Sequence, residues 1–169
     1  MHVFQPMDEK EIDFNVFHMI GEDGYVVVTQ KGEKANAITA DVGGLGTMWG
    51  KNCVFIVLRD SSFSRELLDA TGTFSVNFLD PKKYRTVMRY FGAASGRQED
   101  KIAAMKLNLN QWEKISFLDE ANTVFCARKI HKIEVPAEGI IDQAMLPKWY
   151  QQGDQYSLYI GEILQVMAR

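Results

Sequence analysis

Hydroxyl and guanidinium groups gather where an apolar run of the sequence meets a predicted helix. Arg59 ends the run CVFIVLR, and the helix begins within the segment SSFSREL, which starts at Ser61. Because the first amides of a helix lack partners within it, free amides, hydroxyls and a guanidinium group would here meet an anion together. A phosphate dianion would suit such a site. The alternative is that Ser62 or Ser64 caps the helix while the arginines are solvated, and this segment alone favours neither reading.

A second polar loop, SGRQEDK from Ser95 to Lys101, also leads into a predicted helix. Arg97 and Lys101 would bring positive charge to the same ligand. Taken alone, the loop is better explained as a capped helix with solvated charges.

The segment NAITADVGGLGTMWGK, from Asn36 to Lys51, combines a strand-like start with a glycine-rich end. Glycine lets the backbone approach a ligand closely, but GGLG is equally typical of a plain tight turn. It matches neither GxGxxG nor GxxxxGK[ST], so a Rossmann site and a phosphate loop are both excluded.

Polar side chains in the strand-like part of this segment could contact a flat ring. Strand alternation places Thr39 and Asp41 on one face and Asn36 on the other. Such groups can satisfy ring nitrogens and carbonyls. A half-exposed strand with a polar outer face is the simpler explanation from these residues alone.

The elements that would position these residues are mostly strands. Runs rich in Val, Ile, Phe, Tyr and Thr predict strands at Tyr25–Thr29, Ala35–Thr39, Cys53–Leu58, Thr73–Leu79, Ile115–Leu118, Thr123–Ile130 and Tyr156–Met167, the last with a bulge at Gly161. Helices are predicted at Ser64–Ala70, after the Asp80–Pro81 start with Gly92 just past the end, and at Glu99–Lys106, and an irregular excursion at Ala137–Asp154. This order predicts a mainly β member of the α+β class, an antiparallel barrel with short inserted helices.

The length, charge and amino-acid composition of the chain limit the classes of function that are possible. The 169 residues predict a single domain, 1–169, and a net charge of −3 leaves no excess of positive charge for a nucleic-acid backbone. No apolar run is long enough to cross a membrane and the N-terminal segment is acidic, so we expect a cytoplasmic protein without a membrane partner. The two cysteines and three histidines lack metal-ligand spacing, so no metal site is predicted.

These motifs together resemble the flavin reductase-like family of the FMN-binding split β-barrel, and its flavoredoxin-like branch in particular. The resemblance rests on NAITADVGGLGTMWGK, R-x-S-x-x-S-x-E-L at Arg59–Leu67, FSVNF at Phe74–Phe78, SGRQEDK, and G-D-x-x-x-L-Y-I-G-E-I at Gly153–Ile163. It covers nearly the whole chain in family order. Departures are Val42, Asn52 and Tyr156, where relatives often have tryptophan, proline and histidine; the last removes a possible proton donor.

The resemblance implies a homodimer with FMN near the subunit interface. The flavin edge would be lined by Asn36, Thr39, Ala40 and Asp41, with Trp49 and Lys51 as further lining residues. The phosphate would be surrounded by Arg59, Ser61, Ser62 and Ser64, with Arg97 and Lys101 adding positive charge. Ser95 would be a further cofactor-binding residue. No catalytic acid or nucleophile is required, because the chemistry takes place on the flavin. Lys101 or Arg97 would support the reduced flavin electrostatically.

The leading hypothesis is an FMN-binding oxidoreductase, a flavin reductase that uses NADH or NADPH and passes electrons to an unknown acceptor. The chain has no separate dinucleotide-binding domain, so nicotinamide would share the flavin pocket. The alternative is a flavoredoxin-like carrier that exchanges electrons with a redox protein partner and does not use NAD(P)H. A weaker third possibility is a binding module of the same fold that has lost FMN.

Overall fold

One antiparallel sheet organises the molecule. The structure, a computed structural model, describes residues 1–169 except the side chain of Gln152. The sheet has the order β3-β2-β6-β9-β10-β5-β4, and β1 pairs with β10. The strands are β1 (Gln5–Met7), β2 (Tyr25–Lys31), β3 (Lys34–Ala40), β4 (Gly43–Met48), β5 (Lys51–Arg59), β6 (Thr73–Phe78), β7 (Leu109–Trp112), β8 (Ile115–Leu118), β9 (Thr123–Val135) and β10 (Tyr156–Ala168).

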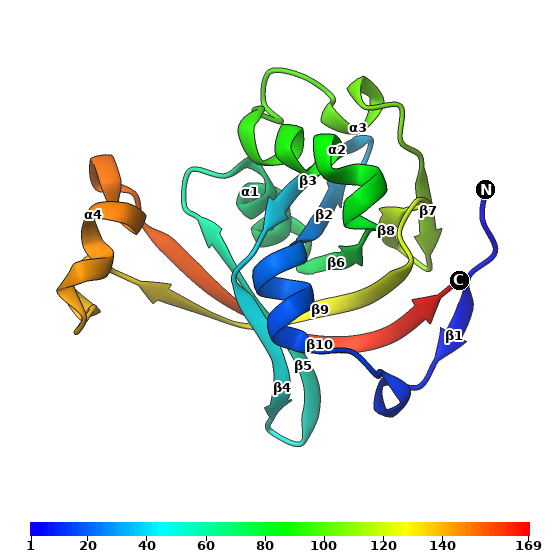
Figure 1. The fold of residues 1–169 in the computed structure, drawn as a ribbon, viewed down its shortest axis with the longest axis horizontal. Helices are drawn as coiled ribbons and strands as arrows, with labels where there is room; N and C mark the ends of the chain where they lie inside the picture. The colour runs from blue at the N-terminus through cyan, green and yellow to red at the C-terminus, as the bar shows by residue number, and fades with distance from the viewer.

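The sheet curls without closing, because β3 and β4 stand at its two ends and do not pair with each other. Figure 1 shows the two long strands β9 and β10 crossing the molecule beneath the helices. The predicted α+β fold with a split antiparallel barrel is confirmed. The strand β2 is apolar on both faces: Val27 belongs to the barrel core, and Val26 and Val28 pack against the helical layer.

The helices lie on both faces of the sheet: Leu68 of α1 (Phe63–Thr71) packs in the barrel core with Val27, whereas α2 (Pro81–Ala93) packs on the opposite face, against Val26 and Val28. Figure 1 shows α4 (Leu146–Trp149) apart from the other helices. The remaining helical segments are α3 (Lys101–Ala104) and the 3-10 and π segments Glu9–Glu11, Phe17–Asp23, Ala137–Gly139, Gln143–Met145 and Gln151–Gly153. Asp80 caps α2 as expected, accepting from the amide of Lys82 at 2.9 Å. The end of α2 was predicted wrongly: Gly92 lies in its last turn, and Ala94 is the C-cap.

The glycine-rich segment is a strand and not the predicted loop. Gly43, Gly44 and Gly46 lie in β4 and pair with β5. A side chain at Gly43, where φ is +130°, would overlap the carbonyl oxygen of Phe55. Glycine at this position therefore allows the two strands to approach each other closely. The turn follows at Trp49 and Gly50, both of which have a positive φ.

Two other predictions concern the strands β10 and β8. The bulge at Gly161 is confirmed, since the pairing of β10 with β9 shifts register between Ile160 and Gly161. The strand Ile115–Leu118 forms, but it pairs only with β7 in a separate hairpin and does not extend the barrel. The outer ends of β9 and β10, with the irregular residues 136–155 between them, project from the body as an arm (Figure 1).

Candidate anion-binding site

The structure brings most of the predicted phosphate ligands to one small cavity of about 140 Å³. Its walls come from β3, the end of β5, the start of α1 and the loop that joins α2 to α3. They are formed by Asn36, Ile38, Arg59, Ser61, Ser62, Phe63, Ala94, Ser95, Gly96, Arg97 and Lys101. We call this cavity the cradle. Its size suits a phosphate group and is far smaller than a whole flavin nucleotide.

The helix α1 directs its N-terminus into the cradle. Its first intrahelical hydrogen bond runs from the amide of Glu66 to the carbonyl of Ser62, at 3.4 Å, so the amides of Phe63 and Ser64 precede the hydrogen-bonded turns. Ser62 is the N-cap residue, yet its side chain makes no capping bond, and its buried hydroxyl oxygen has no partner. The Ser62 side chain therefore does not cap the helix, although Arg59 is exposed, as the capping alternative also expected. An unsatisfied hydroxyl beside free helix amides is suited to an anion.

Asn36 forms the inner wall of the cradle. Its side-chain nitrogen donates to the Ser64 hydroxyl at 2.8 Å, while its amide oxygen is buried without a partner. Thr29 pairs with Asn36 across the strands, and its hydroxyl is likewise buried and unpartnered. Gly96 completes this wall, because any side chain there would overlap the Asn36 amide. Several polar atoms near the start of α1 thus lack partners within the protein.

Lys101 is the buried cation of the cradle, with 3% of its surface exposed. Its ammonium donates to the carbonyls of Phe91 at 2.8 Å and Ala94 at 3.2 Å, which leaves one of its three protons for a ligand. Burial lowers the pKa of Lys101 to about 8, against the opposing effect of Glu99. An anion in the cradle would raise this pKa again, because it favours the charged form of the ammonium.

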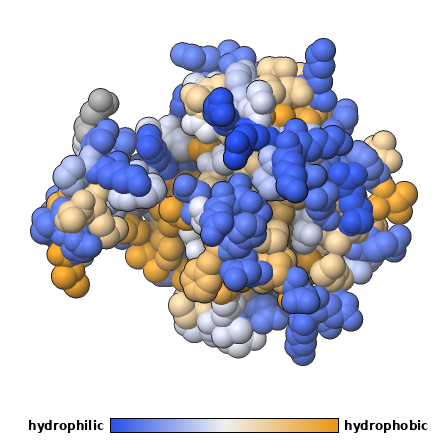
Figure 2. Space-filling model, in the orientation of Figure 1, coloured by the Kyte–Doolittle hydropathy of each residue, from blue (hydrophilic) through white to orange (hydrophobic). Residues whose placement is uncertain are grey.

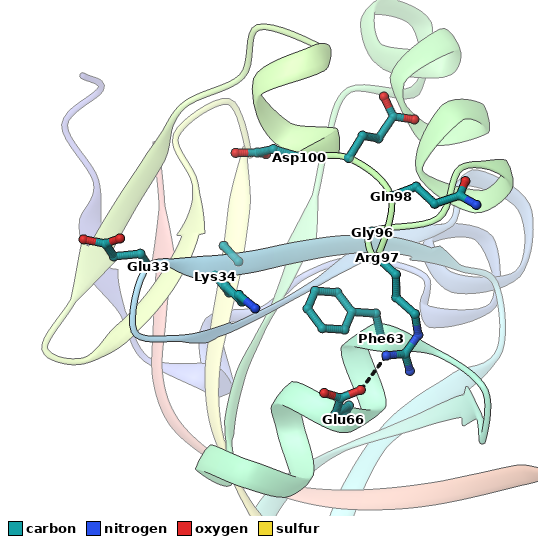
Figure 3. Close-up of a pocket in the computed structure, with 10 residues that line it drawn as sticks. Glu33, Lys34, Phe63, Glu66, Gly96, Arg97, Gln98 and Asp100 are labelled. Atoms are coloured by element: carbon teal, nitrogen blue, oxygen red, sulfur yellow. Dashed lines mark hydrogen bonds and ion pairs between the residues drawn. The ribbon is translucent and has the colours of Figure 1, made fainter.

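The two arginines of the cradle are held at its rim by carboxylates. Arg59 lies 3.6 Å from Asp154, which belongs to the arm. Arg97 donates to Glu66 at 2.6 Å and lies over the ring of Phe63, 5.3 Å from its centroid (Figure 3). Both guanidinium groups are exposed and can reorient toward an anion.

The residues predicted to line the ring divide between two faces of β3, as the alternation predicts. Asn36 faces the cradle, whereas the Thr39 hydroxyl donates to the Met88 carbonyl of α2 at 2.6 Å. Thr39, Ala40 and Asp41 line a separate hollow with Met88, Arg89 and Gly92.

Trp49 and Lys51 do not line the cradle. They occupy the turn and the first residue of β5, whereas Arg59 is its last residue. Eight steps of about 3.3 Å place the two ends of this strand roughly 26 Å apart. Trp49 is 63% exposed, and Lys51 donates to Glu162 at 2.7 Å.

At each of the three positions where the sequence departs from its relatives, the residue makes a hydrogen bond within the protein. The Val42 carbonyl accepts from Tyr25 at 2.6 Å, Asn52 donates to Glu9 at 2.8 Å, and Tyr156 donates to the Trp149 carbonyl at 2.5 Å. Sequence reasoning missed four residues of the cradle: Ile38, Phe63, Ala94 and Gly96. Only Gly96 carried a signal, as the glycine of the loop before α3.

Comparison with known proteins gives the class to which this open antiparallel barrel belongs. Residues 20–169 match the family model described as "Flavin reductase like domain". The chain belongs to the flavin reductase-like family, as the motifs predict. A comparison with curated protein sequences finds no match.

Solved structures share this fold. Flavoredoxin from Methanosarcina acetivorans is 18% identical, with a TM-score of 0.69, over 96% of this chain and 76% of that one. An FMN-binding domain of a flavin reductases-like enzyme from Shewanella baltica is 13% identical, with a TM-score of 0.68, over 99% and 79%. The NADH:FAD oxidoreductase SgcE6 from Streptomyces globisporus is 16% identical, with a TM-score of 0.63, over 86% and 75%.

In the described part of the chain, no three His, Cys, Asp or Glu side chains are grouped to hold a metal ion. None of its helices has the length and apolar character needed to span a membrane.

Proposed function

We propose that this protein binds FMN, with the phosphate in the cradle, and acts as an oxidoreductase that takes electrons from NADH or NADPH. The unpartnered hydroxyl of Ser62, beside the free amides of α1 and the buried Lys101, is the observation that carries the proposal. These groups fit a phosphate dianion and leave its oxygens with several donors. Bound FMN would supply the redox chemistry, accepting a hydride and passing electrons onward.

The protein's own residues bind and orient the nucleotide in this proposal. The amides of α1 and the hydroxyls of Ser61 and Ser62 hold the phosphate, and Ser64 fixes Asn36 in place. Lys101 adds a positive charge that is held by two backbone carbonyls and so cannot swing away. Its place among the phosphate ligands favours a role at the phosphate over one at the flavin ring.

The test of FMN binding is a fluorescence titration with FMN and with riboflavin, which lacks the phosphate. We expect FMN to bind at least tenfold more tightly. Replacing both Ser61 and Ser62 with alanine should reduce the difference, while riboflavin binding stays unchanged. Equal affinities in the unaltered protein would refute the assignment of the cradle.

A flavoredoxin-like carrier is the second candidate, supported by the structural likeness to flavoredoxin. The two functions differ in the electron donor. Rapid anaerobic reduction of the FMN-loaded protein by NADH or NADPH, with saturation, supports the reductase. Reduction only by a redox protein supports the carrier and overturns the use of NAD(P)H.

We further propose that two copies assemble with FMN near their interface. The arm supports this, since it exposes Ile133, Met145 and Ile141, the last at 97%, and Figure 2 shows apolar residues along it. Trp49 and Lys51, far from the cradle of their own chain, would then reach the flavin bound by the partner. Sedimentation equilibrium tests the proposal, and a monomer at micromolar concentration would overturn it.

A further inference from the structure

The cradle borders a second, larger hollow of about 470 Å³, which takes no part in the proposed phosphate site. The two share Phe63, Gly96 and Arg97 as walls. Figure 3 shows the Arg97 side chain descending between the loop and α1 to meet Glu66. Arg97, stacked on Phe63 and paired with Glu66, therefore forms a partition between the two spaces.

The two sides of this partition differ in charge. The cradle contains the cations Arg59, Lys101 and Arg97 and no carboxylate among its walls. The second hollow is lined by four carboxylates and two cations: Glu33, Glu66, Glu99 and Asp100 against Lys34 and Arg97. With Glu66 paired to Arg97, Glu33, Glu99 and Asp100 remain against Lys34 alone, which leaves a net excess of two negative charges. A second phosphate would be repelled on that side.

FMN and FAD differ in what is attached to the phosphate that the cradle would hold. FMN ends at its phosphate, so both negative charges of the dianion lie in the cationic cradle. In FAD the phosphate is joined to a second one that carries the adenosine, so each carries about one charge. The adenosine is too large for the cradle, and the neighbouring hollow on the far side of Arg97 is the space beside it.

We propose that the acidic hollow makes this site selective for FMN over FAD, with Glu66 as the residue that sets the preference. This inference rests on the proposed binding of FMN phosphate in the cradle. Glu66 holds the Arg97 guanidinium, which would otherwise neutralise the second phosphate, and the remaining carboxylates of the hollow give it a negative field. Glu99 contributes to the same field without contacting Arg97 in this way.

The experiment compares the Kd values of riboflavin, FMN and FAD by fluorescence titration at low ionic strength. The unaltered protein should bind FMN at least tenfold more tightly than FAD. Glu66→Gln should bring the FMN-to-FAD ratio down by about tenfold, mainly through tighter FAD binding, as expected for removal of one charge a few ångströms away. Glu99→Gln should lower it less. Glu11→Gln removes an exposed carboxylate of the N-terminal segment and should leave the ratio unchanged.

Each outcome decides the matter. FAD bound as tightly as FMN by the unaltered protein, or a ratio that neither Glu66→Gln nor Glu99→Gln changes, overturns the inference and leaves the cradle intact. FMN bound no more tightly than riboflavin overturns the proposed function and this inference with it. Thermal melting confirms that each variant is folded, and Glu99→Gln, which leaves the Arg97 partition in place, provides the second test.

Discussion

The charge on Lys101 should make flavin binding depend on pH in a way that isolates the phosphate. Its pKa is lowered to about 8 by burial, so the free protein loses this proton as the pH rises through 8. A phosphate beside the ammonium favours the protonated form and raises the pKa in the complex. Binding above pH 8 therefore requires proton uptake, and the affinity for FMN should fall as the pH rises.

The size of this fall follows from the pKa. About nine tenths of the free protein carries the Lys101 proton at pH 7 and about one tenth at pH 9. If the complex stays protonated, the Kd for FMN rises about tenfold between these values, or about 1.4 kcal/mol. The phosphate itself remains a dianion throughout, since its second pKa is about 6.

The assay is the ratio of the Kd values of riboflavin and FMN at pH 7, 8 and 9. Any titration of the flavin ring or of the rest of the protein cancels in this ratio. Lys101→Arg should keep a high ratio at every pH because the guanidinium stays charged, and Lys101→Met should give a low ratio that does not change. A ratio for the unaltered protein that is constant from pH 7 to 9 would refute the role of Lys101.

Three substitutions test the packing of the site and of the sheet. Ser62→Ala should weaken FMN binding about tenfold. It should leave the melting temperature of the flavin-free protein unchanged or higher, because the buried Ser62 hydroxyl has no hydrogen-bond partner to lose. A clear loss of stability would instead indicate that Ser62 caps the helix. Gly96→Ala should displace the Asn36 amide and lower FMN affinity more than riboflavin affinity in the same titration, and equal losses would contradict this. Gly161→Ala places a methyl group 2.5 Å from the Phe74 ring and should cost about 1–3 kcal/mol of unfolding free energy in urea, with FMN affinity unchanged in the folded protein.

Local patterns in the sequence predicted much of this fold. The run of β2, the Asp80–Pro81 start of α2 and the bulge at Gly161 each follow from the physics of a few neighbouring residues. Grouping Arg59, Ser61, Ser62 and Lys101 in one site required the family resemblance, because the chain separates them by some forty residues while β3 and the α2–α3 loop bring them together.

The errors arise where long-range pairing decides the outcome. Gly43, Gly44 and Gly46 read as a turn, yet their role depends on β5, whose Phe55 carbonyl leaves no room for a side chain at Gly43. Whether Ile115–Leu118 joins the barrel or a separate hairpin depends on the position of β7, which carries a weak strand pattern. Phe63 and Ala94 enter the cradle through the packing of α1 against the α2–α3 loop, which no local pattern reveals.

The most direct test of the central claim is the anaerobic visible spectrum of the protein after incubation with FMN and gel filtration. We predict flavin bands that elute with the protein and bleach rapidly on addition of NADH or NADPH. Protein that elutes without flavin bands, even from a solution with excess FMN, would contradict the assignment of the cofactor and the function built on it.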